Sequence, residues 1–254
     1  VTSCLAAARV VWNSEFHREA FLAALPGCVR QMPDCRPSWV VDRIRERSVV
    51  IPPGVDLDLI DSVPLERDGG PPIVAWNHRW EYDKRPEAFF DALAGVAGRG
   101  LAFRVAVLGE SFAERPPVFE DARARLGDRI IHMGWAPDRR EYVRWLRRSS
   151  VSVSTAVQEN FGIAAVEDAY AGAHPLWPRR LSYPTLLPPG AGDDHLYDGP
   201  EALEWKLASL VADAAAGKLD PGRWAPHLAR YGWAALAPQY DALIDEVAGL
   251  SGGS

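Results

Sequence analysis

Short apolar segments alternate with helical stretches along the middle of the chain. The apolar runs predict strands at residues 73–77, 103–108, 130–133 and 151–155, with a further short strand at 174–176. The stretches between them predict helices at residues 86–97, 117–126, 139–148 and around Glu167. Strands separated by helices of this length need parallel crossovers. The pattern therefore predicts an α/β fold with a Rossmann-like, doubly wound parallel sheet, whose ligands bind beyond the carboxyl ends of the strands.

The first residues carry a smaller unit of the same kind. A strand is predicted at residues 9–12, and Asn13 or Ser14 caps a helix at 15–25 whose acidic start suits the helix dipole. A second helix (38–45) and a strand (48–51) follow. Since one β-α unit cannot bury both of its faces, we expect this part to be the end of a preceding α/β domain.

The turn-forming segment 65–72, which contains Gly69-Gly-Pro-Pro72, indicates a domain boundary. We therefore expect a first part at residues 1–64, a main domain at 65–232, and a C-terminal helical segment at 233–254. The end of the chain is predicted to be helical at residues 200–216, 221–231 and 234–247.

Two glutamates flank the start of the helix that follows the strand at 151–155. Glu159 stands in the loop, Gly162 opens an alanine-rich helix, and Glu167 lies on that helix. Because a helix N-terminus presents unpaired N–H groups, the backbone of Phe161, Gly162 and Ile163 is expected to donate to an anion such as a diphosphate. Two carboxylates beside such a site suit a nucleotide sugar. An ordinary strand-loop-helix unit with solvated glutamates remains the alternative.

The loop after the first sheet strand, Trp76-Asn-His-Arg79-Trp-Glu-Tyr-Asp-Lys84, carries two cations. The Arg79 guanidinium and the Lys84 ammonium together could neutralise a pyrophosphate leaving group. In the alternative interpretation they pair with the neighbouring carboxylates. We assign Asn77 and His78 to substrate binding by their position. Two such loops in one sheet favour the pyrophosphate interpretation.

Composition narrows the function further. The 254-residue chain has a net charge of −6, which argues against a surface that binds nucleic acid everywhere but allows local patches. Arginines recur at helical spacing at positions 139, 140, 144, 147 and 148. They form a solvated helix face or, as the minority interpretation, a contact for nucleic-acid phosphates.

The cysteines and apolar runs indicate a cytoplasmic protein. Cys4, Cys28 and Cys35 are odd in number and lack CxxC spacing, so neither a disulfide framework nor a zinc site is indicated. The sequence contains no apolar run that approaches the roughly 20 residues needed to cross a bilayer, so we expect no membrane association.

These motifs resemble a known family. Three features resemble the donor half of retaining GT-B glycosyltransferases of family four. They are the spacing of Glu159 and Glu167 with Phe161-Gly162 between them, the pair Arg79 and Lys84, and the linker Ile51-Pro-Pro-Gly-Val-Asp56. The stretches 76–84 and 172–184 resemble more specifically the tRNA-queuosine mannosyltransferase group. The similarity covers nearly the whole chain, from Val11 to the region of Tyr231.

The resemblance implies a role for each matching residue. Arg79 and Lys84 would hold the donor diphosphate, Glu159 with the backbone at Phe161 and Gly162 would contact the sugar hydroxyls, and Glu167 would accept from the ribose hydroxyls. The reaction would transfer mannose from GDP-mannose to queuosine in tRNA and retain the anomeric configuration. Stabilising the departing diphosphate would then matter more than a strong base. Two cations make a metal dispensable. The nearest acidic pairs, Asp56 with Asp58 and Asp193 with Asp194, are assigned to the linker and a late loop, so we expect no metal and no cofactor beyond the donor.

Two departures leave alternatives open. Thr185 stands where the subgroup is expected to have an acidic residue. The second departure is that residues 1–64 would be only a remnant of the N-terminal acceptor domain, with its linker. Residues 65–232 would be the nucleotide-sugar-binding domain, and residues 233–254 a helix that returns toward the first domain. We therefore expect the chain alone to bind a donor weakly and to transfer little or no sugar. The apolar residues Leu236, Leu243 and Val247 of the last helix would have a poor partner, which leaves a homo-oligomer open. The alternatives are a family-four transferase with another donor and a small-molecule or glycan acceptor, and a nucleotide-sugar-binding domain without turnover.

Overall fold

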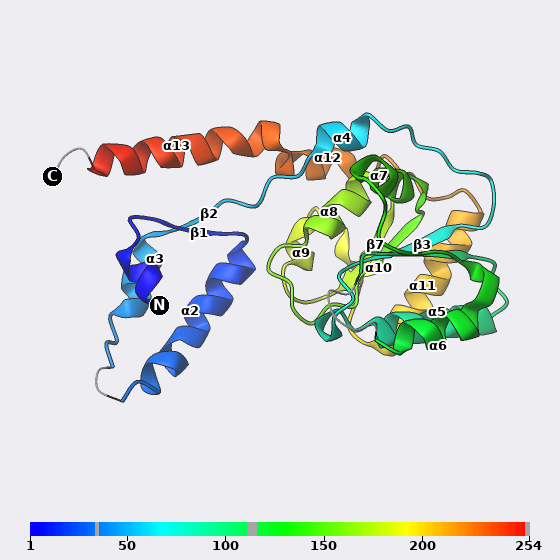
Figure 1. Ribbon diagram of the computed structural model, residues 1–254, viewed down its shortest axis with the longest axis horizontal. Coiled ribbons are helices and arrows are strands. Elements are labelled where there is room, and N and C mark those ends of the chain that lie inside the picture. The colour runs from blue at the N-terminus through cyan, green and yellow to red at the C-terminus, as the bar shows by residue number, and fades with distance from the viewer. Residues whose placement is uncertain (34–35, 111–115, 252–254) are drawn as a thin grey trace. The chain divides into compact units, whose positions relative to one another are not determined.

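A computed structural model describes residues 1–33, 36–110 and 116–251 (Figure 1). Cys35 lies outside these ranges. The chain forms two compact units, one of Val1–Gly54 with Arg230–Ser254 and one of Val55–Ala229. The boundaries expected from the sequence were after residues 64 and 232. Among the described residues, no helix combines the length and the apolar character needed to cross a membrane.

The first unit contains a two-stranded parallel sheet packed against helices. Strand β1 (Val10–Trp12) pairs with β2 (Ser48–Val50), and the helices are α1 (Thr2–Ala6), α2 (Glu15–Arg30), α3 (Val40–Glu46) and α13 (Trp233–Ser251). The hydroxyl of Ser14 accepts from the amide of His17 at 3.0 Å, which confirms a predicted cap of α2. Helix α2 continues beyond the predicted end at Leu25 because Leu25 and Val29 are both buried in the core of this unit.

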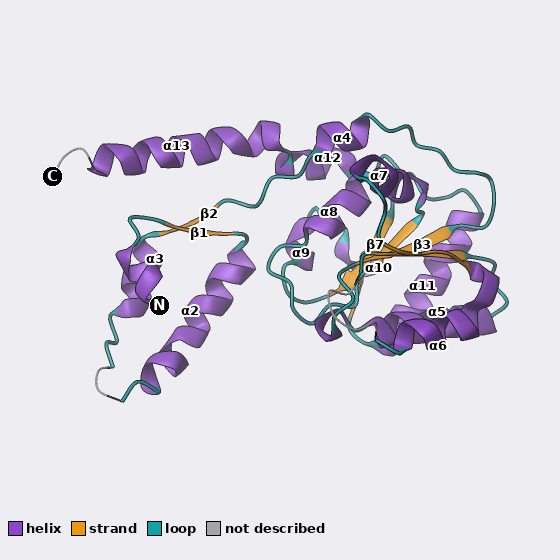
Figure 2. Cartoon of the chain, in the orientation of Figure 1, coloured by secondary structure: helices purple, strands orange, loops and turns teal. Residues whose placement is uncertain are grey.

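The second unit confirms the predicted doubly wound parallel sheet. Its six parallel strands lie in the order β5-β4-β3-β6-β7-β8. They are β3 (Ile73–Asn77), β4 (Arg104–Leu108), β5 (Ile130–Gly134), β6 (Val151–Val153), β7 (His174–Pro178) and β8 (Leu196–Tyr197). Figure 2 shows strands of this sheet, in orange, between the helices. The direction of winding reverses between β3 and β6, so the loops after these two strands lie side by side at the switch point where such folds bind ligands.

Helices cover both faces of this sheet (Figure 1). One face is covered by α5 (Pro86–Gly98), α6 (Val118–Leu126) and α11 (Pro200–Ala215), whose apolar residues form a core with buried strand residues such as Val74, Trp76 and Val107. The other face is covered by α4 (Leu57–Asp61), α7 (Arg139–Arg148), α8 (Ile163–Tyr170) and α12 (Ala225–Leu228). Because both faces are covered, the residues of β3 and β7 are all buried.

The segments after β7 differ most from the sequence pattern. Two short helices, α9 (Tyr183–Leu186) and α10 (Gly192–His195), and the two-residue strand β8 were not predicted. The helix predicted at residues 221–231 is reduced to α12 and one further tight turn at Ala229–Tyr231. It begins late because the carboxylate of Asp220 accepts from the amide of Gly222 at 2.8 Å and forms a turn instead.

Candidate functional site

The two loops that carry the predicted site residues are joined by buried hydrogen bonds. The indole of Trp76 on β3 donates to the hydroxyl of Thr155 at 3.0 Å, and this hydroxyl donates to the carbonyl of Lys84 at 2.6 Å. The amide of Val157 donates to the carbonyl of Asp83 at 2.8 Å. These bonds fix the loop after β3 against the loop after β6 at the switch point.

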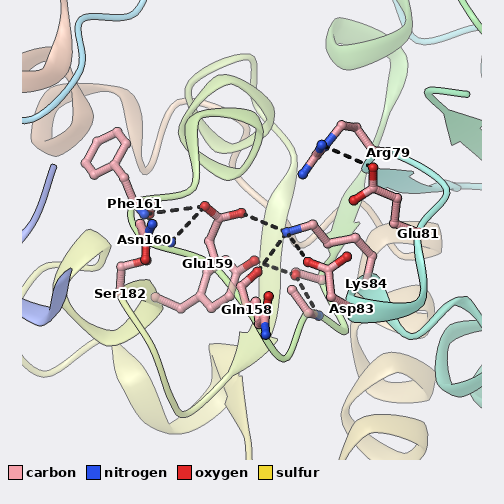
Figure 3. Close-up of polar contacts among 12 residues, drawn as sticks. Arg79, Glu81, Asp83, Lys84, Gln158, Glu159, Asn160, Phe161 and Ser182 are labelled. Carbon is pink, nitrogen blue, oxygen red and sulfur yellow. Dashed lines mark hydrogen bonds and ion pairs between the residues drawn. The ribbon is translucent and has the colours of Figure 1, made fainter. Parts of the chain in front are cut away.

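The structure brings Lys84 and Glu159 together (Figure 3). The Lys84 ammonium donates to the carbonyl of Gln158 at 2.7 Å and lies 3.2 Å from a carboxylate oxygen of Asp83 and 3.5 Å from one of Glu159. Only 9% of the Lys84 side chain is exposed. The second carboxylate oxygen of Asp83 is buried and has no hydrogen-bond partner among the described residues. Lys84 is therefore a buried cation with two carboxylates beside it.

Arg79 does not join this group. Its guanidinium lies 3.1 Å from Glu81, with 59% of the side chain exposed, and Figure 3 draws an interaction from it to Glu81 and none to Lys84. Both cations therefore pair with neighbouring carboxylates, as the alternative interpretation of the sequence expected: Arg79 with Glu81, and Lys84 with Asp83 and Glu159. An exposed pair such as that of Arg79 contributes only about 0–1 kcal/mol, so a phosphate can replace Glu81 at little cost.

The loop after β6 turns into α8 at Gly162. Gly162 has φ +99°, a left-handed conformation that favours glycine, and caps α8. One carboxylate oxygen of Glu159 accepts from the amides of Asn160 at 3.1 Å and Phe161 at 3.4 Å. Of the predicted backbone donors, the amide of Phe161 is therefore engaged by Glu159, and the side chain of Ile163 is exposed.

The loop after β7 supports the Glu159 loop. The hydroxyl of Ser182 donates to the carbonyl of Phe161 at 2.7 Å, and the guanidinium of Arg180 donates to the carbonyl of Ala156 at 3.1 Å. Leu181, between them, has φ +61°. A left-handed non-glycine residue costs of the order of 1–3 kcal/mol, and such strain is concentrated at functional sites. This loop therefore holds the Glu159 loop in place.

A cavity of about 440 Å³ lies beside these loops, at the ends of β3, β4 and β5. Cavities that hold small ligands are typically about 300–1,000 Å³. The cavity is lined by Asn77, His78, Arg79, Leu108, Gly109, Glu110, Trp135, Ala136, Pro137, Asp138, Arg139, Tyr142 and Ala164. Three residues that we assigned from the sequence therefore line this cavity, together with residues from the first turns of α7 and α8. They are Asn77, His78 and Arg79.

Two features fix the wall at His78. Gly109 has φ +108°, and a Cβ atom there would lie 2.1 Å from the carbonyl oxygen of His78, so only glycine lets the loops after β3 and β4 approach this closely. Burial and, to a smaller extent, the positive charge of Lys84 together lower the pKa of His78 to about 3. His78 therefore presents a neutral imidazole to the cavity at neutral pH.

Glu167 lies beside the cavity and is held by α7. One carboxylate oxygen accepts from the guanidinium of Arg139 at 2.8 Å and the other from the hydroxyl of Tyr142 at 2.6 Å. Burial, together with the charges of Glu167 and Asp168, raises the pKa of Tyr142, so its hydroxyl stays protonated and donates. Each oxygen of Glu167 retains a second lone pair that can accept from a ligand hydroxyl.

The network continues inward to Asp168, which the sequence interpretation missed together with Arg139 and Tyr142. The amide of Asn77 donates to the Tyr142 oxygen at 2.8 Å and to Asp168 at 2.9 Å, and Ser152 donates to Asp168 at 2.6 Å. An available signal was that Asp168 shares a helix face with Ala164, Ala165 and Ala171, one turn before and after it, on a helix that packs on a sheet. An unpaired carboxylate on such a face would be costly.

We expect Asp168→Asn to stabilise the protein more at pH 8 than at pH 5. Burial raises the pKa of Asp168 from 3.8 to about 7, opposed by the hydrogen bonds of Ser152 and Asn77. The unfolded chain therefore loses this proton near pH 4 and the folded chain only near pH 7. Wild-type stability should fall between these values, by up to about 1.4 kcal/mol per pH unit, whereas asparagine does not titrate.

Urea unfolding of both proteins across this pH range measures the difference. The exposed Asp193→Asn serves as the control and should show no such trend. A difference between Asp168→Asn and wild type that stays constant from pH 5 to pH 8 would contradict the burial of an ionising Asp168.

The chain is similar in sequence to known proteins. Residues 1–55 match a family model described as tRNA-queuosine alpha-mannosyltransferase N-terminal. The chain is also 31% identical, over 218 residues, to the tRNA-queuosine alpha-mannosyltransferase of Drosophila melanogaster. This alignment covers 82% of the chain and 56% of the fly protein, so the chain spans little more than half the length of this relative.

Solved structures share the fold at low sequence identity. HepE from Anabaena, in complex with UDP and glucose, superimposes with a TM-score of 0.69 and 16% identity over 94% of this chain and 63% of its own. Sucrose-phosphate synthase from Thermosynechococcus elongatus gives a TM-score of 0.71 and 20% identity over 98% and 60% of the two chains. At these identities the likeness concerns the fold alone.

Proposed function

We propose that this chain supplies the donor site for the transfer of mannose from GDP-mannose to queuosine in tRNA. The chain belongs to the GT-B glycosyltransferases, and within them it resembles the tRNA-queuosine mannosyltransferases. The observation that carries the proposal is the approach of Lys84 to Glu159 at the switch point, beside a cavity of about 440 Å³. The acceptor would be met in the cytoplasm.

The donor diphosphate would bind between the two loops. Lys84 is already held there by Gln158 and Asp83, and its contact with Glu159, at 3.5 Å, is the longest of the three. A phosphate oxygen can therefore approach the ammonium from the side of Glu159 without disturbing the two shorter contacts. Arg79 lines the neighbouring cavity and would turn from Glu81 toward the phosphates.

The nucleoside would occupy the cavity. Trp135, whose residue surface is 66% exposed, lines it and offers an aromatic face for a base. Glu167 would accept from the ribose hydroxyls at the edge next to α8. The exposed guanidinium of Arg139 would move aside for this contact, while Tyr142 keeps Glu167 in place.

The chemistry would depend on charge stabilisation. As the bond between the anomeric carbon and the diphosphate breaks, negative charge grows on the leaving oxygen, and Lys84 and Arg79 would stabilise it. Glu159 would orient the sugar through its hydroxyls while positive charge grows on the ring. The acceptor hydroxyl would enter on the face from which the diphosphate leaves, so the anomeric configuration is retained.

Calorimetry with a panel of nucleotide sugars tests the donor. GDP-mannose should bind most tightly, ahead of GDP-glucose, UDP-glucose and UDP-N-acetylglucosamine. Mass spectrometry of tRNA nucleosides from cells that lack the full gene should then show queuosine without its mannose. Preference for a UDP-sugar, or unchanged tRNA nucleosides, would refute the proposed donor or acceptor.

Glu167→Gln should reduce affinity for GDP more than for its 2′,3′-dideoxy analogue. The neutral amide is a weaker acceptor for the ribose hydroxyls, and hydrogen bonds to charged groups are worth about 1.5–3 kcal/mol. Calorimetry with both ligands measures the difference, and Glu141→Gln on the surface of α7 is the control. Equal binding of the two ligands by the wild-type protein would remove Glu167 from the ribose site.

A further inference from the structure

Helix α7 carries a row of three arginines on its surface. Arg140, Arg144 and Arg148 follow one another at four-residue spacing, while Val143 and Leu146 are buried against the domain. The row is about 12 Å long, at about 1.5 Å per helical residue. One strand of a nucleic-acid duplex carries three or four phosphates over this length, at about 3.4 Å along the axis.

This row forms one side of an open groove. The other side is the segment between α4 and β3, and the hollow between them measures about 750 Å³. It continues past Arg148 into a second hollow of about 270 Å³, where Arg104 of β4 takes part. Together the two hollows are lined by five arginines (67, 104, 140, 144 and 148) and three carboxylates (Glu66, Asp68 and Glu141). This local excess of positive charge lies on a chain whose net charge is −6.

Two arginines of the row are held loosely. Arg140 is exposed, and the structure describes no side-chain partner for it; Arg144 pairs with Glu141 at 2.8 Å with 54% of its side chain exposed. Arg148 is half-buried: it lies 3.3 Å from Asp68, and its guanidinium stacks 4.5 Å from the ring centroid of Trp145. Exposed pairs of this kind contribute about 0–1 kcal/mol, whereas a guanidinium binds phosphate through two parallel hydrogen bonds. A polyanion can therefore displace these partners.

The row begins at the functional site. Arg139, the residue before Arg140, contacts Glu167 and lines the cavity beside Lys84. From there α7 leads away toward the opposite edge of the sheet, because helices that follow parallel strands run antiparallel to them. A nucleic acid whose target nucleoside lies at the carboxyl edge would thus meet the row with its neighbouring phosphates.

We propose that Arg140, Arg144 and Arg148 bind the phosphate backbone of the nucleic-acid acceptor, an inference that rests on the proposed transfer to tRNA. Binding of this kind has a measurable signature. Each phosphate contact releases condensed counterions, so the logarithm of the binding constant falls with the logarithm of salt concentration by about 0.9 for each contact on a duplex. Removing two arginines should lower this slope by nearly two.

The test measures fluorescence anisotropy of a labelled tRNA transcript with the full chain over a series of salt concentrations. Arg140→Ala/Arg144→Ala should weaken binding at least tenfold and reduce the salt slope by nearly two. Arg99→Ala/Arg125→Ala is the matched control, since Arg99 directly follows α5, Arg125 lies on α6, and both are exposed and ion-paired on the other face of the sheet. The control should retain wild-type binding and slope, and GDP affinity should be unchanged in both variants.

The binding measurements can contradict the proposed role of the arginine row in several ways. Equal loss in the two double variants, an unchanged slope, or a wild-type chain that does not bind tRNA would overturn the proposal. So would tighter binding to vesicles of anionic phospholipid than to tRNA. A wild-type chain that binds tRNA through the row but binds no GDP-mannose would instead refute the proposed function and leave the nucleic-acid surface intact.

Discussion

Replacement of Lys84 by methionine is expected to weaken GDP binding by about 10- to 100-fold while guanosine binds as before. Methionine keeps much of the length of the side chain and removes the charge that would contact the diphosphate, an interaction worth about 1.5–3 kcal/mol. Calorimetry with both ligands measures the effect. A similar loss for GDP and guanosine would show that Lys84 does not contact the diphosphate.

The buried position of Lys84 requires a second variant. Without the ammonium, the Asp83 carboxylate is left buried and unpaired, and removing one partner of a buried pair typically costs about 3–5 kcal/mol. Asp83→Asn in addition to Lys84→Met should therefore restore much of the lost stability in urea without restoring GDP affinity. If the second change recovers both, the ammonium acts on binding only by keeping the loop folded.

Arg79→Ala tests the second cation of this loop, which is exposed. Among the described residues, the guanidinium of Arg79 is ion-paired with Glu81 alone. Its loss should therefore leave the free energy of unfolding within about 0.5 kcal/mol of the wild-type value. GDP affinity should still fall more than guanosine affinity.

Thr155→Val is expected to lower the free energy of unfolding by about 2–4 kcal/mol. The hydroxyl of Thr155 accepts from the indole of Trp76 and donates to the carbonyl of Lys84, and the residue is 1% exposed. Valine has nearly the same shape but leaves both buried groups without a partner, at about 1–3 kcal/mol each. Urea denaturation measures the change, and GDP affinity should fall as well because the Lys84 loop loses its attachment.

Thr155→Ser is the matched control. Serine removes a methyl group but keeps the hydroxyl, so the variant should lose less than half as much stability as Thr155→Val and bind GDP nearly as well as wild type. The opposite order of the two variants would mean that packing of the methyl group, and not the pair of hydrogen bonds, joins the loops.

The sequence by itself determined the architecture of the main domain. Buried strands of a parallel sheet must be apolar along their whole length, so β3 begins and ends at the predicted residues, as does α7, whose Asp138 cap and basic end mark its limits. The segments after β7 were predicted less well, because a strand of two residues and a helix of one turn carry no periodic signal. The roles assigned to Arg79, Lys84, Glu159 and Glu167 stay predictions.

The tertiary structure decided how the site residues are grouped. Arg79 and Lys84 stand in one loop and look equivalent in sequence, yet only Lys84 points into the switch point, where a carbonyl and two carboxylates surround it. Tyr142 and Asp168 enter the site because α7 and α8 pack on the same face of the sheet beside β3. Sequence patterns report which residues must be buried. Which buried groups meet depends on strand order and helix packing, and these are fixed by contacts between residues far apart in the chain.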